Sequence, residues 1–86
     1  MPNIKQQEKR VRVAAEERLR NLRYRSTVKT LTRRLRDAVA DGDAEAITST
    51  HLRLVRSIDK ATARGALHRN TAARRKAQAA KLVAGK

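Results

Sequence analysis

Two glycines interrupt a sequence that otherwise consists of good helix formers, and they constrain the fold more than any other feature. Alanine, arginine and leucine dominate the 86 residues, the only proline is Pro2, and no alternation of polar and apolar residues predicts a strand. Gly42 lies in an Asp-Gly-Asp turn, and Gly65 is suited to the left-handed residue that ends a helix. The chain is therefore predicted to be all-α, with helices over residues 4–40, 43–64 and 69–84.

Apolar side chains recur at helical spacing in the first two predicted helices. The first stripe comprises Tyr24, Val28, Leu31, Leu35 and Ala38, and the second comprises Ile47, His51, Leu54, Ile58 and Ala61. Such stripes are typical of the seam between antiparallel helices joined by a short turn. The third predicted helix offers a narrow small-residue face of Ala72, Ala73, Ala77, Ala80 and Val83, with Leu67 at the junction before it. We predict a three-helix bundle.

The ends of the second and third helices carry candidate capping residues. Asp41 or Asp43 can cap the second helix, and Asn70 or Thr71 can cap the third. Tyr24 and His51 lie on the apolar stripes, so we expect both to pack against the core. For Tyr24 the alternative is stacking on a base or ribose.

The first predicted helix is longer than its apolar stripe. At about 1.5 Å per residue it reaches about 50 Å, well past its partner helix. Its first twenty residues hold six basic side chains and few large apolar ones. We therefore expect a single domain over residues 1–86 whose extension, about residues 1–23, projects from the bundle. Without a polyanion this extension should fray.

Positive charge is unevenly distributed over the chain, whose net charge is +14. Residues 1–40 hold twelve basic and four acidic side chains, residues 41–64 hold four of each, and residues 65–86 hold six basic and no acidic ones. Nucleic acid is the leading partner for such a chain, and an anionic membrane surface is the second. The only aromatic residue is Tyr24, which favours contacts to phosphates and duplex shape over base stacking.

Two groups of basic residues are candidate phosphate contacts. The first lies near one face of the first helix and comprises Arg18, Arg25, Lys29, Arg33 and Arg36. The second crowds the start of the third helix, where backbone N–H groups also favour anions, and comprises Arg69, Arg74, Arg75 and Lys76. Any single member of the first group can equally serve only to solvate the helix. For His68, a hydrogen bond to phosphate or sugar and a capping or packing role are equally expected.

Catalytic and metal chemistry is not expected. The chain has no cysteine, and His51 and His68 are far apart without an acidic partner pattern. No nucleophile–base pair, carboxylate pair or phosphate-binding glycine loop is present, so we predict neither an enzyme, a cofactor nor a small-molecule substrate. No run of about 18 apolar residues and no signal-peptide core occurs. We expect a cytoplasmic protein that spans no membrane and forms no homo-oligomer.

Four segments resemble the bacterial small-subunit ribosomal protein number twenty. They are Asn3-Ile4-Lys5 with Lys9-Arg10, Arg25-Ser26 with Arg33-Arg34, the turn Ala40-Asp41-Gly42-Asp43, and the stretch from Asp59 to Lys76. The most specific part is His68-Arg69-Asn70 after Gly65, followed by alanines and a basic cluster. The resemblance covers essentially the whole chain, although Gln6 stands where the family usually has serine and Glu8 is acidic in a basic neighbourhood.

The resemblance implies a three-helix bundle that binds small-subunit ribosomal RNA directly, early in assembly, near the bottom of the subunit. It adds Lys5, Lys9, Arg10 and Asn70 to the candidate RNA contacts. The alternative is a nucleoid-type basic protein that coats DNA, which has the same charge pattern. A membrane-active cationic helix would need a wide apolar face, and the first twenty residues have none.

Overall fold

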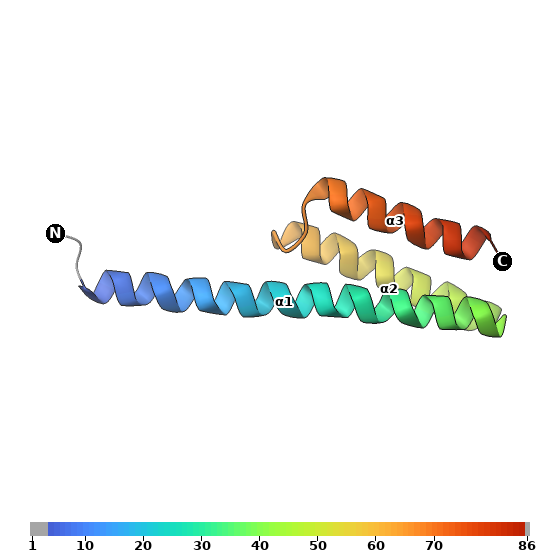
Figure 1. Ribbon diagram of the computed structural model, residues 1–86, viewed down its shortest axis with the longest axis horizontal. Coiled ribbons are helices and arrows are strands. Elements are labelled where there is room, and N and C mark those ends of the chain that lie inside the picture. The colour runs from blue at the N-terminus through green and yellow to red at the C-terminus, as the bar shows by residue number, and fades with distance from the viewer. Residues whose placement is uncertain (1–3, 86) are drawn as a thin grey trace.

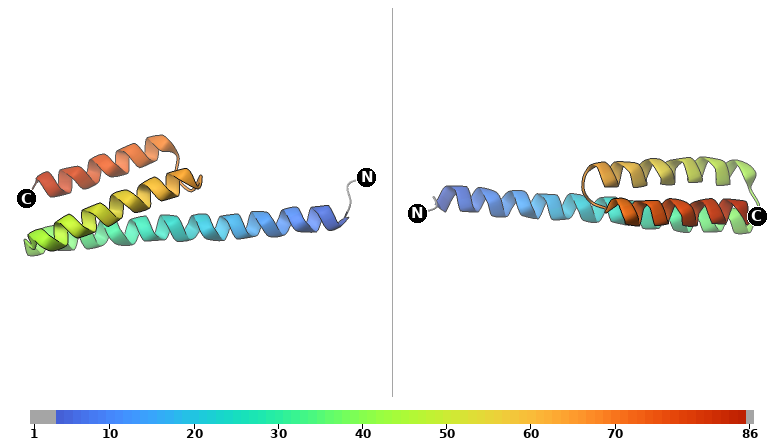
Figure 2. Two further views of the ribbon diagram at one scale, coloured as in Figure 1. Left: turned by 180° about the vertical axis from the view of Figure 1, so that it is seen from behind. Right: turned by 90° about the horizontal axis from the view of Figure 1, so that it is seen from above.

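The computed structural model describes residues 4–85, and within them the chain forms three helices and no strand. They are α1 (Ile4–Asp41), α2 (Ala44–Ala63) and α3 (Arg69–Ala84). α2 runs back along the C-terminal half of α1, and α3 reverses again to lie beside both (Figures 1 and 2). The molecule measures 61 × 21 × 13 Å because α1 extends far past the other two helices. The predicted all-α bundle is confirmed, and each helix boundary lies within one residue of its prediction.

Both helix breaks are Schellman motifs built on a glycine with positive φ. Gly42 has φ 70°, its N–H donates to Val39 O at 3.2 Å, and the N–H of Asp43 donates to Ala38 O at 3.3 Å. Gly65 has φ 77°, and the following Ala66 N–H donates to Ala61 O at 2.8 Å. A Cβ at either glycine would meet nothing within 4 Å. The backbone conformation, rather than lack of space, therefore requires glycine at these positions.

The caps of α2 and α3 differ in how well the sequence predicted them. Asp43 caps α2, since its Oδ1 accepts from the Ala46 N–H at 3.2 Å. The prediction of Asn70 or Thr71 for α3 was wrong, because His68 is the cap and its Nδ1 accepts from the Asn70 N–H at 3.1 Å. His68 has an extended backbone and directly precedes the first helical residue, so its imidazole nitrogen reaches the free N–H groups of the first turn.

The core lies along the predicted seam between α1 and α2. Leu35, Leu54 and Ile58 are the largest fully buried side chains. The other predicted seam residues are buried as well, except Tyr24 and His51, which are half-buried. Leu67 is half-buried and packs against the core, as expected.

The predicted small-residue face of α3 was partly wrong. Ala72 is buried as predicted, but Ala73, Ala77 and Ala80 are exposed and Ala79 is buried instead. Leu82 and Val83 pack half-buried against the core from the same side of α3 as Ala79. These larger side chains determine which alanines face inward, because their burial removes more apolar surface from water.

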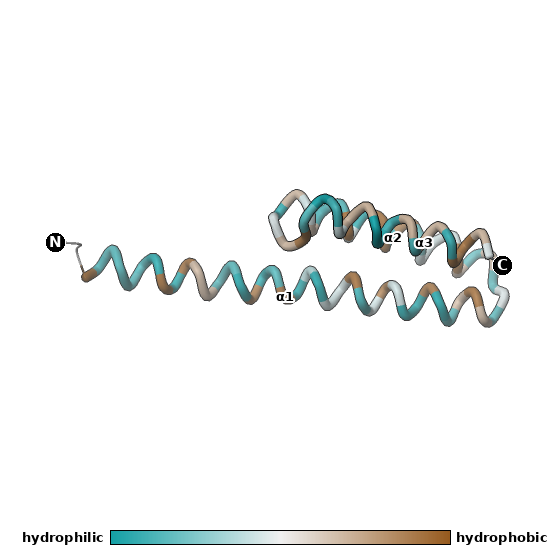
Figure 3. The backbone as a smooth tube through the Cα atoms, turned by 45° about the horizontal axis from the view of Figure 1, so that its top comes forward, coloured by the Kyte–Doolittle hydropathy of each residue, from teal (hydrophilic) through white to brown (hydrophobic). Residues whose placement is uncertain are grey.

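The N-terminal half of α1 projects from the bundle, as predicted. From Ile4 to Arg20 every residue is exposed except the half-buried Ala14. Figure 3 shows this half as a mostly hydrophilic rod with isolated hydrophobic positions. This half of the helix therefore gains no stability from a core. Its fraying without RNA stays a prediction. The structure describes residues 4–23 of the predicted extension, and residues 1–3 lie outside the described part of the chain.

Replacing Leu35 or Ile58 with alanine is expected to lower the free energy of unfolding by about 2–4 kcal/mol, because each side chain is fully buried and its loss leaves a cavity. Leu52→Ala is the matched control, since Leu52 is 51% exposed and its truncation leaves no cavity. Urea titration followed by helical circular dichroism measures the difference. Equal shifts in the core variants and the control would show that the seam does not hold the bundle together.

Candidate nucleic-acid interface

The predicted basic residues of α1 form one continuous stripe. Because α1 is uninterrupted here, these positions lie within an arc of about 80° at about 100° per residue. The basic stripe comprises Arg18, Arg25, Lys29, Arg33 and Arg36, all exposed. No acidic residue falls within this arc between Arg18 and Arg36. Apart from the exposed Leu22, the stripe is therefore a row of cations directed away from the core residues Leu31 and Leu35.

Arg25 connects the basic stripe to the rest of the bundle. Its Nε donates to Ala66 O at 3.1 Å, which joins α1 to the connection between α2 and α3. Ala66 is 2% exposed, so this carbonyl has few other partners. A guanidinium carries five N–H donors, and most of those of Arg25 stay available to a phosphate. This hydrogen bond fixes the start of α3 beside the basic stripe.

The predicted cluster at the start of α3 does not form a single patch, because consecutive residues fan around a helix. Arg69 and Arg74 are exposed, whereas Arg75 and Lys76 are half-buried on the flanks of the packed face. Lys76 forms an ion pair with Asp59 of α2. A phosphate at Lys76 would compete with this carboxylate, so Arg69 and Arg74 are better placed to bind an anion.

His68 combines the two roles that its sequence position left open. As an acceptor at Nδ1 it caps α3, which places the hydrogen of the neutral ring on Nε2. The residue is exposed, so Nε2–H is able to donate to a phosphate next to the N-terminus of α3. Asn70, two residues after His68, is exposed, and its backbone N–H is already used by the cap.

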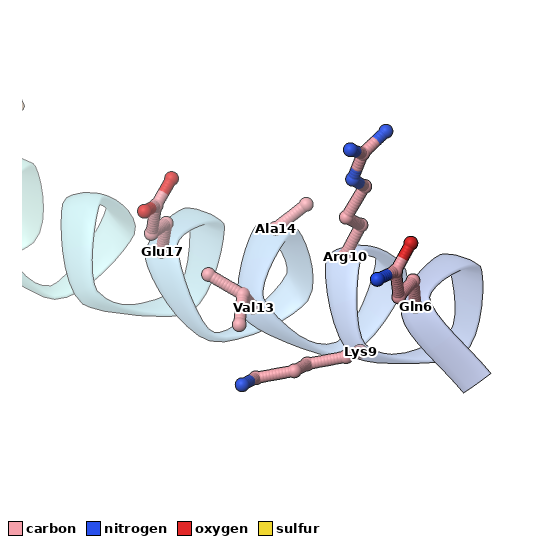
Figure 4. A pocket seen from close by; sticks show the side chains of 6 residues that line it. All are labelled: Gln6, Lys9, Arg10, Val13, Ala14 and Glu17. Atoms are coloured by element: carbon pink, nitrogen blue, oxygen red, sulfur yellow. The ribbon is translucent and has the colours of Figure 1, made fainter. Parts of the chain in front are cut away.

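The remaining predicted contacts lie on the projecting half of α1 and do not share one side. Figure 4 shows Lys9 and Arg10 leaving the helix in different directions. Together with Gln6, Val13, Ala14 and Glu17 they line an open groove along the surface of this single helix. Lys5 is exposed near the start of α1.

Sequence reasoning missed several cations that the structure places at the junctions. Lys81 of α3 lies with Arg36 in a groove between α1 and α3, so it extends the basic stripe across both helices. Arg20 and Arg64 line a hollow between α1 and the end of α2. The helical period alone shows on which side of α1 Arg20 lies. Only the packing of α2 against α1 brings Arg64 close to Arg20.

Other kinds of site find no support within residues 4–85. No group of three histidine or acidic side chains is placed to hold a metal ion there. No described helix has the length and apolar character that crossing a bilayer requires.

Comparison with known proteins identifies the family. The family model for Ribosomal protein S20 matches residues 2–84. A protein of Kocuria rhizophila named small ribosomal subunit protein bS20 is 45% identical over 84 residues, which cover 98% of each chain. A protein of the same name from Beutenbergia cavernae is 44% identical over 99% of each chain, and one from Heliobacterium modesticaldum is 41% identical over 94% of this chain and 92% of its own.

The chain belongs to the ribosomal protein S20 family. This confirms the resemblance that the sequence indicated. Members of the S20 family are structural components rather than enzymes, in agreement with the lack of a predicted catalytic constellation. The match spans both glycine turns and all three helices of this S20-family chain.

Replacing His68 with alanine is expected to lower the stability of this S20-family bundle by about 0.5–2 kcal/mol, because the Asn70 N–H loses its acceptor. His68→Asn retains a side-chain acceptor at the cap position and should melt close to the unmodified protein. Thermal unfolding by circular dichroism compares the two variants. If both melt at the same temperature, the imidazole does not cap α3.

Proposed function

We propose that this protein is a structural component of the bacterial small ribosomal subunit, working in the cytoplasm. It binds small-subunit ribosomal RNA directly through phosphates and bridges RNA helices during assembly. The single domain, residues 1–86, acts as one unit without a homo-oligomeric partner. The proposed contacts are Lys5, Lys9, Arg10, His68, Arg69, Asn70, Arg74, Arg75, Lys76 and the basic stripe.

The observation that carries this proposal is the continuity of positive charge across two helices that the fold holds together. The basic stripe of α1 adjoins α3 through the groove that Arg36 and Lys81 line. The hydrogen bond from Arg25 to Ala66 O fixes the beginning of α3 next to the same stripe. α2, which has three basic and two acidic residues, supplies the apolar seam that supports both. A folded polyphosphate matches such a surface better than a small ligand does.

The names of the relatives favour RNA over DNA. Proteins 41–45% identical to this chain over nearly its full length are named small ribosomal subunit proteins. The near absence of aromatic side chains agrees with recognition of phosphates and duplex shape rather than of stacked bases.

Binding to small-subunit ribosomal RNA is expected to depend strongly on salt, because each neutralised phosphate releases condensed counterions. If about 6–10 phosphates are contacted, affinity should fall about 10³–10⁵-fold between about 50 and 200 mM salt. Filter binding at a series of salt concentrations measures the slope, and duplex DNA serves as competitor. A flat salt response, or preferential binding to the DNA, would contradict the proposal.

The double variant Arg69→Gln with Arg74→Gln is expected to bind the RNA more weakly and to reduce the salt slope by about two, because two exposed cations are lost. The matched control is Arg53→Gln with Arg56→Gln, which removes the same charge from exposed positions of α2. Filter binding of both double variants at several salt concentrations separates a local contact from a general charge effect. Equal losses in the two variants would rule out a specific site at the start of α3.

A further inference from the structure

Two cations from different helices line the same groove between α1 and α3. Arg36 of α1 and Lys81 of α3 border a space of about 310 Å³, together with Thr32, Gln78 and Leu82. α3 runs in the same direction as the C-terminal half of α1 (Figure 1). Both cations are exposed, so an anion is able to reach them from solvent. We call this space the α1–α3 groove.

The protein supplies no carboxylate to either cation of the groove within residues 4–85. α3 holds five basic and no acidic residues, and the positions three and four residues before and after Arg36 on α1 carry no acid. Asp37 follows Arg36 directly but lies about 100° around the helix from it. In the same part of the chain, the ion pair that the structure records joins Lys76 to Asp59. Two positive charges without a carboxylate partner therefore line the groove.

The helix dipole accounts for only one of the two positions. Lys81 lies in the last turn of α3, where the partial negative charge of the helix end favours a cation. Arg36 lies more than one turn before the end of α1 at Asp41, and the effect of the dipole falls off within the last turn. Because like charges repel, stability of the bundle alone would favour a carboxylate or a neutral residue beside Lys81 rather than a second cation.

The contact that these two cations oppose is formed mainly by small side chains. α3 buries only Ala72 and Ala79 fully, and Leu82 and Val83 pack half-buried against the core. Small side chains remove little apolar surface from water, so repulsion weighs more here than at the seam between α1 and α2. An anion bound between the two cations would replace their repulsion with two attractions.

We propose that the α1–α3 groove binds a phosphate group, which bridges Arg36 and Lys81 and thereby holds α3 against α1. Guanidinium and ammonium groups both recognise phosphate, and the exposed amide of Gln78 is able to donate a further hydrogen bond. Thr32 is not a donor to it, because its hydroxyl donates to Val28 O at 2.8 Å. The phosphate belongs either to ribosomal RNA, in which case the inference rests on the proposed function, or to a free ion.

Melting in inorganic phosphate tests the groove without RNA. At a concentration about fivefold above its dissociation constant, phosphate should raise the melting temperature of the unmodified protein by about 4–8 °C relative to sodium chloride of equal ionic strength. The groove variant, Arg36→Gln with Lys81→Gln, should lose this shift. The matched control, Arg53→Gln with Arg56→Gln on α2, removes the same charge from exposed positions and should keep it. Circular dichroism measures all three proteins.

A distance measurement reports the docking of α3 directly. The chain contains no cysteine, so Ser49→Cys on α2 and Ala80→Cys on α3, both at exposed positions, give unique attachment points for two spin labels. Inorganic phosphate should narrow the distribution of distances between the labels, because it holds α3 in one position. With the groove variant as background, the same phosphate concentration should leave the distribution unchanged.

Filter binding to small-subunit ribosomal RNA distinguishes the two sources of the phosphate. If the groove takes an RNA phosphate, the groove variant should reduce the salt slope by about one, whereas the α2 control should keep the slope of the unmodified protein. A lost phosphate shift together with an unchanged salt slope would assign the groove to a free phosphate ion.

The outcomes also separate this inference from the proposed function. If the groove variant and the α2 control show the same phosphate shift and the same salt slope, the phosphate site is wrong and RNA binding by the rest of the protein is unaffected. If the unmodified protein fails to bind ribosomal RNA, the proposed function is wrong. The phosphate shift and the label distances then still decide for or against the groove.

Discussion

The apolar seam between α1 and α2 is the interaction on which the rest of the structure depends. Leu35 from α1 meets Leu54 and Ile58 from α2 in the fully buried centre of the core. Full burial of one such side chain contributes about 1.5–3 kcal/mol, so a few residues supply most of the favourable free energy of a bundle this small. The seam is effective because α2 has a net charge of only +1, from three basic and two acidic residues, so it adds little repulsion against two cationic helices.

Two of the cations serve the fold as well as the surface. Arg25 donates to Ala66 O, and Lys76 pairs with Asp59, so each links helices that otherwise share few large apolar side chains. α3 buries only Ala72 and Ala79 fully, and its orientation therefore depends more on such polar links than that of α2 does. A phosphate bound to either cation would contact a side chain that also helps to position α3. Binding of a phosphate at either cation would therefore be coupled to the packing of α3.

The sequence predicted the parts of the fold that depend on local backbone geometry and helical period. Gly42 and Gly65 end helices because both adopt positive φ, and this preference is readable from residue type. The seam was predictable because large apolar residues recur every three or four positions. The face of α3 was not, because alanines occur on several sides of that helix and only its packing selects Ala79 over Ala80. The capping role of His68 was one of several open choices until the hydrogen bond from Asn70 was seen.

The candidate interface also has parts that the sequence predicts and parts that depend on how the helices pack. The basic stripe follows from residue spacing alone, since a continuous helix converts separation in sequence into angle and distance. The helical period also predicts that Arg74, Arg75 and Lys76 point in different directions around α3. Which of them faces Asp59 depends on how α3 packs. Arg36 and Lys81 line one hollow and Arg20 and Arg64 line another, and only the tertiary structure brings the members of each pair together.

Because α1 is one continuous helix, the spacing of its charged residues in the sequence determines where their side chains lie in space. Over 38 residues the helix contains no glycine or proline, so it spans about 57 Å with no residue suited to a hinge. The spacing between the cations of the basic stripe is therefore set by residue count, and the rigid helix maintains it. Phosphates bound along the stripe would be held at fixed distances from one another. A flexible basic tail with the same charge could neutralise the same phosphates, but it could not position them relative to each other.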